Sequence, residues 1–316
     1  MSYAQFGLIQ ASDFNTLAGG NPTTTSGTIN AVWATGGTNA GYGQTAVANV
    51  SAGGTVTASD WANVVNNTAN SASHQGTSIT SVTAPSSGGT VTYLSAVPTN
   101  LTTIYTSRLN AASQGSTSAN AVSTAATWSD KAVWTHTVTF ANGDAARYFF
   151  NSGGQLKVTC SHPSGTGINL LLNNLASNVG TVVMSSPTSG SVTIASTSYN
   201  GITKVGGGGN APTVSTNTGY YALTISNVSV FTQTASTGPS GYLSTNINVT
   251  VKSNGTQGSN GDAGSVITIY TTWDEIPNGL VVATGSTTTV TAQAPETTYL
   301  GNSWGSITVA GSVAVV

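Results

Sequence analysis

The stretch Ala132-Val133-Trp134-Thr135-His136-Thr137-Val138-Thr139-Phe140 alternates apolar residues with threonine. A period of two residues is typical of a half-buried strand, whereas a helix repeats its apolar face every three to four residues. Seven further runs of this kind are separated by Gly, Asn and Ser clusters: Leu156–Cys160, Val192–Ile194, Tyr221–Phe231, Ile247–Val251, Val266–Tyr270, Val290–Ala292 and Ile307–Val316. The pattern predicts an antiparallel β-sandwich or jelly-roll-like domain over residues 116–316.

Helical patterns occupy the rest of the chain. Residues 1–115 carry three short candidate helices joined by Gly-rich loops, at Ser12–Leu17, Ser59–Val65 and about Thr99–Ala112. Two more helical segments interrupt the strands: Gly143–Phe150 follows an Asn142 cap, and Ile168–Leu175 carries leucines for one sheet face. We therefore expect a mainly β protein with a helical N-terminal part. A small, loop-rich attachment domain (1–115) precedes a β-sandwich domain (116–316) with one or two inserted helices.

Charged residues are unusually scarce. They make up 4% of the 316 residues, against about 25% in an ordinary soluble domain. Six basic and eight acidic side chains give a net charge of −2, so the chain lacks the cations that nucleic acid or an anionic membrane would require. Interspersed charge normally prevents association. Its absence predicts a surface that contacts other protein.

The start of the chain bears on its location. Met1–Leu8 has neither a basic start nor a long apolar stretch, and no window approaches the ~20 apolar residues of a membrane span. We therefore expect no signal peptide and no membrane insertion. A hydroxyl-rich exterior made without export is typical of a particle that is assembled in a bacterial cytoplasm and released by lysis, so the virion is the expected location.

Catalytic and metal-binding patterns are absent. His74, His136 and His162 have no second His or Cys at ligand spacing, and Cys160 is the lone cysteine. His136 alternates with Trp134 and Val138, which predicts a place on a sheet face beside a hydrogen-bond partner. An enzyme would require at least two acidic groups or histidines to converge in one pocket; the acidic candidates are Asp144, Asp262, Asp274, Glu275 and Glu296. We expect no catalytic, cofactor-binding or metal-binding residue and no cofactor.

Four aromatic residues are candidates for contact with a partner protein or a glycan: Tyr42, Tyr220, Trp273 and Trp304. The alternative is that these rings lie in the core, because a period of two places most aromatic residues there. Exposed aromatic rings along a groove would favour sugar binding. Burial of all six tryptophans would remove the basis for that function.

Several segments together resemble a known class of proteins. They are Ile9–Asn15, Ala31–Gly36 leading to Gly41-Tyr42-Gly43-Gln44, Val56–Trp61, His74-Gln75-Gly76, Phe140–Gly154 and Thr297–Gly305. In this order they are similar to segments of structural proteins from tailed bacteriophages, notably phages of marine and freshwater hosts. The resemblance spans most of the chain. It implies a virion protein and carries over no catalytic residue.

The expected function is therefore mechanical. Neither heptads nor short regular β repeats, which a fibre shaft would show, occur in the sequence. We expect a homo-oligomeric tail or baseplate component, including a fibre-type subunit, whose partners are its own copies and other virion proteins. A capsid decoration (cement) protein is the alternative within the virion. A carbohydrate-binding receptor module that contacts a host surface glycan is the alternative of a different class.

Overall fold

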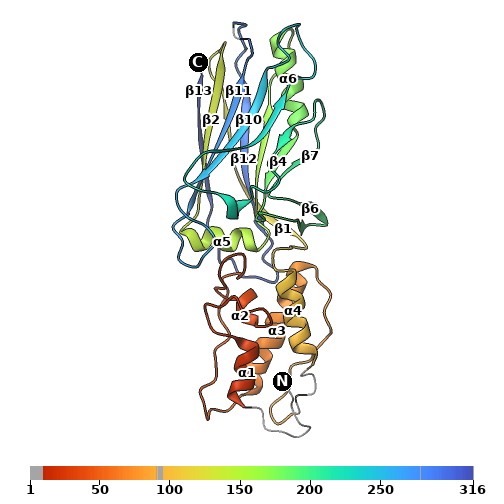
Figure 1. Cartoon of the computed structure of the whole chain (residues 1–316), viewed down its shortest axis with the longest axis vertical. Helices are drawn as coiled ribbons and strands as arrows, with labels where there is room; N and C mark the ends of the chain where they lie inside the picture. Colours follow the sequence, from red (N-terminus) through yellow and green to blue (C-terminus); the bar gives the residue numbers. More distant parts are fainter. Residues whose placement is uncertain (1–9, 90, 92–94, 278, 316) are drawn as a thin grey trace.

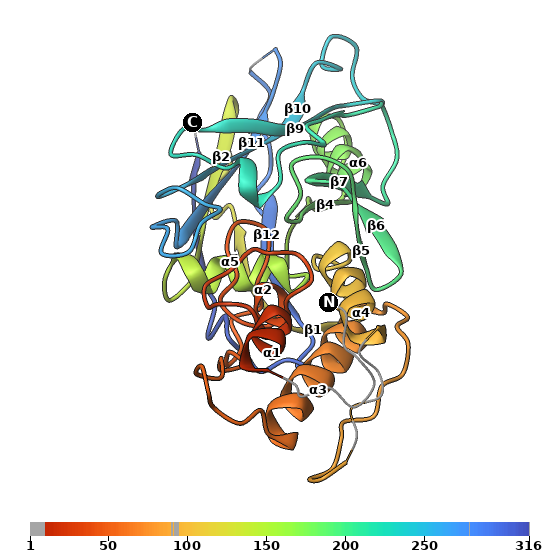
Figure 2. The ribbon, with the colours of Figure 1, turned by 60° about the horizontal axis from the view of Figure 1, so that its bottom comes forward.

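The computed structural model describes residues 10–89, 91, 95–277 and 279–315. Of the segments named above, Met1–Leu8, Ile9 and Val316 lie outside these ranges. The molecule is elongated, with the helical N-terminal part at one end and the sheets at the other (Figure 1). Figure 2 shows helices α1, α3 and α4 gathered at the helical end.

In the described ranges, the N-terminal part is built from four helices around one core. The helices are α1 Ala11–Ala18, α2 Ile29–Val32, α3 Ala58–Gln75 and α4 Ala96–Thr106. Helix α3 begins with a reciprocal capping box between Thr57 and Asp60 and ends at Gly76 in the left-handed conformation. Phe14 and Trp61 meet edge to face at 5.8 Å in the core. This core also contains Leu300, which arrives from near the other end of the chain.

The second part contains two large sheets. One has five strands, in the order β1 Gln114–Ser123, β12 Thr287–Pro295, β3 Gln155–Ser161, β4 Thr181–Met184 and β7 Ile202–Val205. The other has six, in the order β13 Thr308–Val315, β2 Lys131–Thr139, β11 Val266–Asp274, β10 Asn246–Ser253, β9 Val228–Thr234 and β8 Thr213–Val214. A hairpin of β5 Val192–Ile194 and β6 Thr197–Tyr199 lies apart from both. All the strand pairs are antiparallel, which confirms the predicted mainly β, sandwich-like fold with helices.

The period-two pattern of β2 is realised as a buried and a less buried face. Burial alternates residue by residue along β2, β10, β11 and β12, so one face of each strand enters the core. Trp134 of β2 packs against Trp273 of β11 at 5.3 Å. The Trp134 indole N–H also donates to the Val122 carbonyl of β1 at 2.8 Å and thereby ties the two sheets together.

The two inserted helices occupy different places. Helix α5 Gly143–Asn151 begins at Asn142, whose side chain accepts from the Ala145 N–H at 2.8 Å, and lies at the end of the sandwich nearest α1–α4 (Figure 1). Helix α6 Ile168–Val179 packs against β3 of one sheet and against β9 and β10 of the other. Its leucines 171, 172 and 175 are buried, so α6 fills the sandwich core where the sheets diverge.

Two expectations need correction. The predicted strand Tyr221–Phe231 is a strand only in its second half, because β9 begins at Val228 and residues Tyr220–Ala222 form a short 3₁₀ helix, η1. Strand β1 was not predicted at all. Its Ser, Ala, Asn and Thr side chains carry almost no hydrophobic alternation, and its position depends on pairing with β12, which lies far away in sequence.

Helix α6 offers a matched pair of substitutions. We expect Leu171→Ala to lower the free energy of unfolding by about 2–5 kcal/mol, because it leaves a cavity between the sheets. Leu170→Ala changes the neighbouring residue, which is 45% exposed, and is expected to cost less than about 0.5 kcal/mol. Denaturant unfolding of both variants measures the difference, and equal costs would contradict the placement of α6.

Candidate functional site

The loop Gly36–Gln44 lies at the junction between the helical part and the sandwich. Backbone hydrogen bonds hold it to the end of α2: the Tyr42 N–H donates to the Val32 carbonyl at 2.9 Å, and the Gly43 N–H donates to the Ala34 carbonyl at 2.8 Å. Gly43 has φ +69°, and its missing Cβ makes room for the ring of Tyr148. The loop therefore touches α5 with its backbone, and a side chain at position 43 would prevent this contact.

Helix α5 holds the loop from the sandwich side. Arg147 is only 1% exposed, and its Nη1 donates to the Ala40 carbonyl at 2.8 Å while its Nη2 donates to Asp144 Oδ1 at 2.8 Å. One turn later, Asn151 Nδ2 donates to the Gly41 carbonyl at 3.0 Å. A guanidinium can be buried only when partners replace its water. Here the carbonyl of the loop is one of those partners, so the charge binds the two parts of the molecule together.

A third segment, Thr297–Gly305, completes the junction. The side-chain amide of Gln44 forms two hydrogen bonds with the backbone of Gly301, at 2.8 and 2.9 Å. Ser303 Oγ donates to the Tyr42 carbonyl, and Leu300 enters the N-terminal core. From α3, His74 Nε2 lies 3.0 Å from the Ser152 carbonyl.

These contacts unite four of the segments for which the sequence predicts a resemblance to phage structural proteins. The segments Gly41–Gln44, His74–Gly76, Phe140–Gly154 and Thr297–Gly305 are far apart in sequence, yet they meet at this one junction. Their polar groups bind one another across the two parts of the molecule. The arrangement holds the helical part against the sandwich.

The four predicted contact residues are all buried within the chain, at 2% exposure or less. The Tyr42 hydroxyl donates to the Arg108 carbonyl and accepts from Gln75 Nε2, and burial holds the pKa of Tyr42 well above its usual range. Tyr220 stacks on Phe150 at 4.3 Å between ring centres. Trp273 packs on Trp134, and Trp304 lies in the sandwich core. These four rings therefore stabilise the fold and offer no surface to a partner.

Burial also extends to every tryptophan. The six are Trp33, Trp61, Trp128, Trp134, Trp273 and Trp304. An aromatic platform for a sugar needs exposed ring faces. The glycan-binding alternative accordingly loses the observation on which it depended.

Several carboxylates are held in caps, turns and the Arg147 pair. Glu275 accepts from the backbone N–H groups of Gly279 and Leu280, at 3.3 and 3.0 Å, and Asp144 binds Arg147. Glu296 accepts from the hydroxyl and backbone N–H of Thr298. In the described ranges, no group of three His, Cys, Asp or Glu side chains could hold a metal ion.

His136 lies on the inner face of the sheet, as the alternation predicts, and its residue is fully buried. Its ring is near the backbone of Asn120 in β1, whose hydrogen bond favours the charged ring, although the geometry of this contact is poor. Burial lowers the pKa of His136 and keeps the ring neutral at pH 7.

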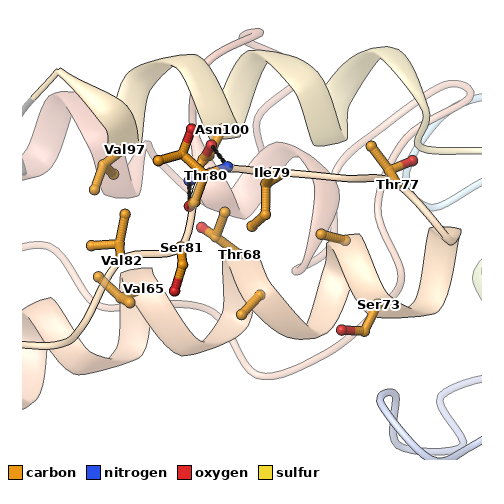
Figure 3. A pocket seen from close by; sticks show the side chains of 12 residues that line it. Val65, Thr68, Ser73, Thr77, Ile79, Thr80, Ser81, Val82, Val97 and Asn100 are labelled. Carbon is orange, nitrogen blue, oxygen red and sulfur yellow. Dashed lines mark hydrogen bonds between the residues drawn. The ribbon is translucent and has the colours of Figure 1, made fainter.

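A pocket of about 250 Å³ opens in the N-terminal part (Figure 3). It lies between α3, α4 and the extended segment 77–82, which Asn100 holds through two hydrogen bonds to the backbone of Thr80, at 3.0 and 2.8 Å. Its lining consists of small apolar and hydroxyl side chains with the Asn100 amide, and contains no carboxylate or histidine. Such a pocket can exclude water from an apolar group but has no acid or base for catalysis.

The few charges are largely bound inside the chain. Arg108 donates to the carbonyl and side chain of Asn39, each at 2.7 Å, and Lys204 donates to the Gly208 carbonyl at 3.1 Å. Asp13 and Asp60 cap helices. In the described part of the chain, Arg147–Asp144 is the single salt bridge. Arg147 and Glu275 are the charged residues that are buried in the described part, and the few others remain partly exposed.

Within the described ranges, none of the helices combines the length and the apolar character that crossing a membrane requires. The chain matches no protein-family model, no curated protein and no solved structure. The resemblance to phage structural proteins therefore stays a prediction.

Two glycines test the junction. Gly43 and Gly53 both have positive φ, +69° and +78°, but a Cβ meets the Tyr148 ring at Gly43 and open space at Gly53. We expect Gly53→Ala to cost about 1 kcal/mol of unfolding free energy through backbone strain alone. Gly43→Ala is expected to cost a further 1–3 kcal/mol, roughly, because α5 must move away from the loop. Denaturant unfolding gives both values, and equal costs would contradict the close contact.

The buried His74 makes stability depend on pH. Burial lowers the pKa of His74 from 6.5 to about 4, although the Ser152 carbonyl and Glu296 favour the charged ring. Between these two values only the unfolded chain takes up the proton, so stability falls as the pH drops from 6.5 towards 4, by up to about 1.4 kcal/mol per pH unit. We expect the His74→Gln variant to lose this part of the dependence of the unfolding free energy on pH. Denaturant unfolding at each pH measures it. A variant with the wild-type slope would contradict the assignment.

Proposed function

We propose that this chain is a structural component of the virion of a tailed bacteriophage. Within the virion it forms a homo-oligomeric subunit of the tail or baseplate, a class that includes fibre-type subunits. The observation that carries the proposal is an almost uncharged exterior on an elongated, two-part molecule. The helical part serves for attachment to the particle. The sandwich projects from it or packs against its own copies.

The charge distribution supports this function. A freely diffusing protein of this size keeps apart from its neighbours through repulsion and strong hydration of surface charges. Here the charged groups are directed to intrachain partners, as for Arg108, Arg147 and Lys204. The remaining surface of hydroxyl, amide and small apolar groups binds protein through apolar contact and hydrogen bonds.

The junction supports the same function. An appendage must transmit force from its attachment site to its far end, so its two parts have to be held together firmly. The contacts of Arg147, Asn151 and Gln44 join three separate segments across the boundary. Catalysis is not needed for this work, and the pocket of the helical part contains neither a carboxylate nor a histidine.

Immunogold labelling tests the proposal. Antibodies against the purified chain are applied to particles from infected-cell lysates, and the particles are imaged by electron microscopy. Label at the tail or baseplate supports the proposal, and label spread over the head identifies the decoration-protein alternative. Unlabelled particles, with the chain recovered only in the soluble fraction, would overturn a virion function.

The neutral surface also predicts how assembly responds to salt. Between 0.05 and 0.5 M NaCl the Debye length shrinks from about 14 Å to about 4 Å, which weakens contacts between exposed charges but not apolar contacts. We expect the oligomers of the purified chain to keep their sedimentation coefficient over this range. Dissociation on adding salt would show that ion pairs hold the subunits.

A further inference from the structure

The two sides of the sandwich have edge strands of different length. On one side the edge strands are β7 and β8, of four and two residues, and the link between them is bound through Gly208 to Lys204 and Gln233. On the other side the edge strands are β1 and β13, of ten and eight residues. Short or covered edges resist further pairing, whereas long free edges invite it. The second side therefore has the longer unpaired edges, and β1 and β13 approach each other there across the two sheets.

Strand β13 has the less protected of these two edges. It pairs with β2 alone, in continuous register, and most of its residues are exposed (Figure 1). Its sequence, Thr308-Val309-Ala310-Gly311-Ser312-Val313-Ala314-Val315, contains no charge and no proline. Natural edge strands usually carry Lys, Pro or a bulge that prevents association. Strand β1 has such a device, a register shift between Gln114 and Thr117, and β13 has none.

The middle of β13 cannot carry a side chain on its inner face. A Cβ at Gly311 would be 2.7 Å from His136 Nε2 and 2.8 Å from Asn120 Oδ1. His136 is the cross-strand neighbour of Gly311 on β2 and is fully buried. The requirement for glycine at position 311 therefore follows from packing within the chain.

The β13 sequence is nearly symmetric about Gly311. In antiparallel strands, residues directly opposite one another point to the same face of the sheet. The inner-face residues Val309, Gly311 and Val313 must then lie opposite inner-face residues of the added strand. A second β13, related by a two-fold axis through Gly311, meets this condition: Val309 lies opposite Val313, Ala310 opposite Ser312, and Gly311 opposite itself.

We propose that β13 is the interface between two copies of this chain. The two strands pair antiparallel about Gly311 and join the two six-stranded sheets into one continuous sheet. The partner is a second copy, because the strand is complementary to itself and carries no charge that would repel the same strand of another molecule. This inference rests on the homo-oligomeric character proposed above. It does not depend on where in the particle the protein lies.

Lysine substitutions on the two edges test the interface. Ala310→Lys and Ser312→Lys lie on the outer face of β13 and place like charges opposite each other across the pair. We expect the double variant to weaken the dimer at least about tenfold in sedimentation. The matched control, Ala119→Lys with Ala121→Lys on exposed positions of β1, is expected to leave the dimer unchanged. Circular dichroism confirms that both variants remain folded.

Cysteine pairing tests the register. Chains carrying Ala310→Cys are mixed with chains carrying Ser312→Cys and oxidised, because directly opposite residues lie within disulfide reach. A disulfide-linked dimer in the mixture, and little in either chain alone, is the expected result. Self-linkage of the Ser312→Cys chain alone would refute the axis through Gly311.

Other outcomes separate this inference from the function. A wild-type chain that is monomeric at tens of micromolar, or a dimer lost only with the β1 lysines, overturns the β13 interface. Labelled particles together with an intact oligomer of the β13 lysine variant would refute the interface and leave the virion function standing. A dimer lost with the β13 lysines, together with unlabelled particles, would support the β13 interface and refute the virion function.

Discussion

The buried guanidinium of Arg147 is the constraint on which the joining of the two parts depends. A cation that is almost fully removed from water is stable only where several oxygens surround it. Asp144 supplies one from the same helix, and the carbonyl of Ala40 supplies another from the N-terminal part. The loop around Ala40 must therefore stay against α5. Asn151 of the same helix reinforces this position, and Gln44 of the loop adds a contact with a third segment at Gly301. A chain with only six basic residues uses one of them at the boundary between its domains.

The scarcity of charged residues also determines the character of the exterior. Arg108 and Lys204 bind carbonyl groups of their own chain, and acidic residues such as Asp60 cap helices, so few charges are left for solvent. A surface of this kind has little electrostatic protection against association. It suits a protein that is surrounded by copies and neighbours, and its contacts depend weakly on ionic strength. Composition and structure support the proposed virion function through this one property.

The sandwich is asymmetric for a physical reason. Helix α6 packs between the sheets next to β3, β9 and β10, where its leucines fill the core. On the opposite side no helix is inserted in the described part, and the sheets approach each other through β1, β2 and β13, with Trp134 donating to Val122 across the gap. Gly311 of β13 pairs there with His136 of β2, and the His136 ring occupies the space that a side chain at position 311 would need. One side of the sandwich is therefore filled by a helix, and the other is closed by direct contact between the sheets.

The alternating run around Trp134 determined the strand, its inner face and the sandwich class. The Asn142 cap determined the start of α5. Each of these signals lies within a few neighbouring residues, so the sequence alone contains it. Strand β1 could not be predicted, since its small side chains gain their place only by pairing with β12. Tyr221 seemed part of a strand by its neighbours, but its hydroxyl binds Asn151 at the junction and the chain turns there instead. Tertiary structure likewise decided the burial of Tyr42, whose hydroxyl binds Gln75 and Arg108, 33 and 66 positions away. It also decided the meeting of the Gly41, Arg147 and Gly301 segments, which are more than a hundred positions apart, because a local pattern carries no information over such distances.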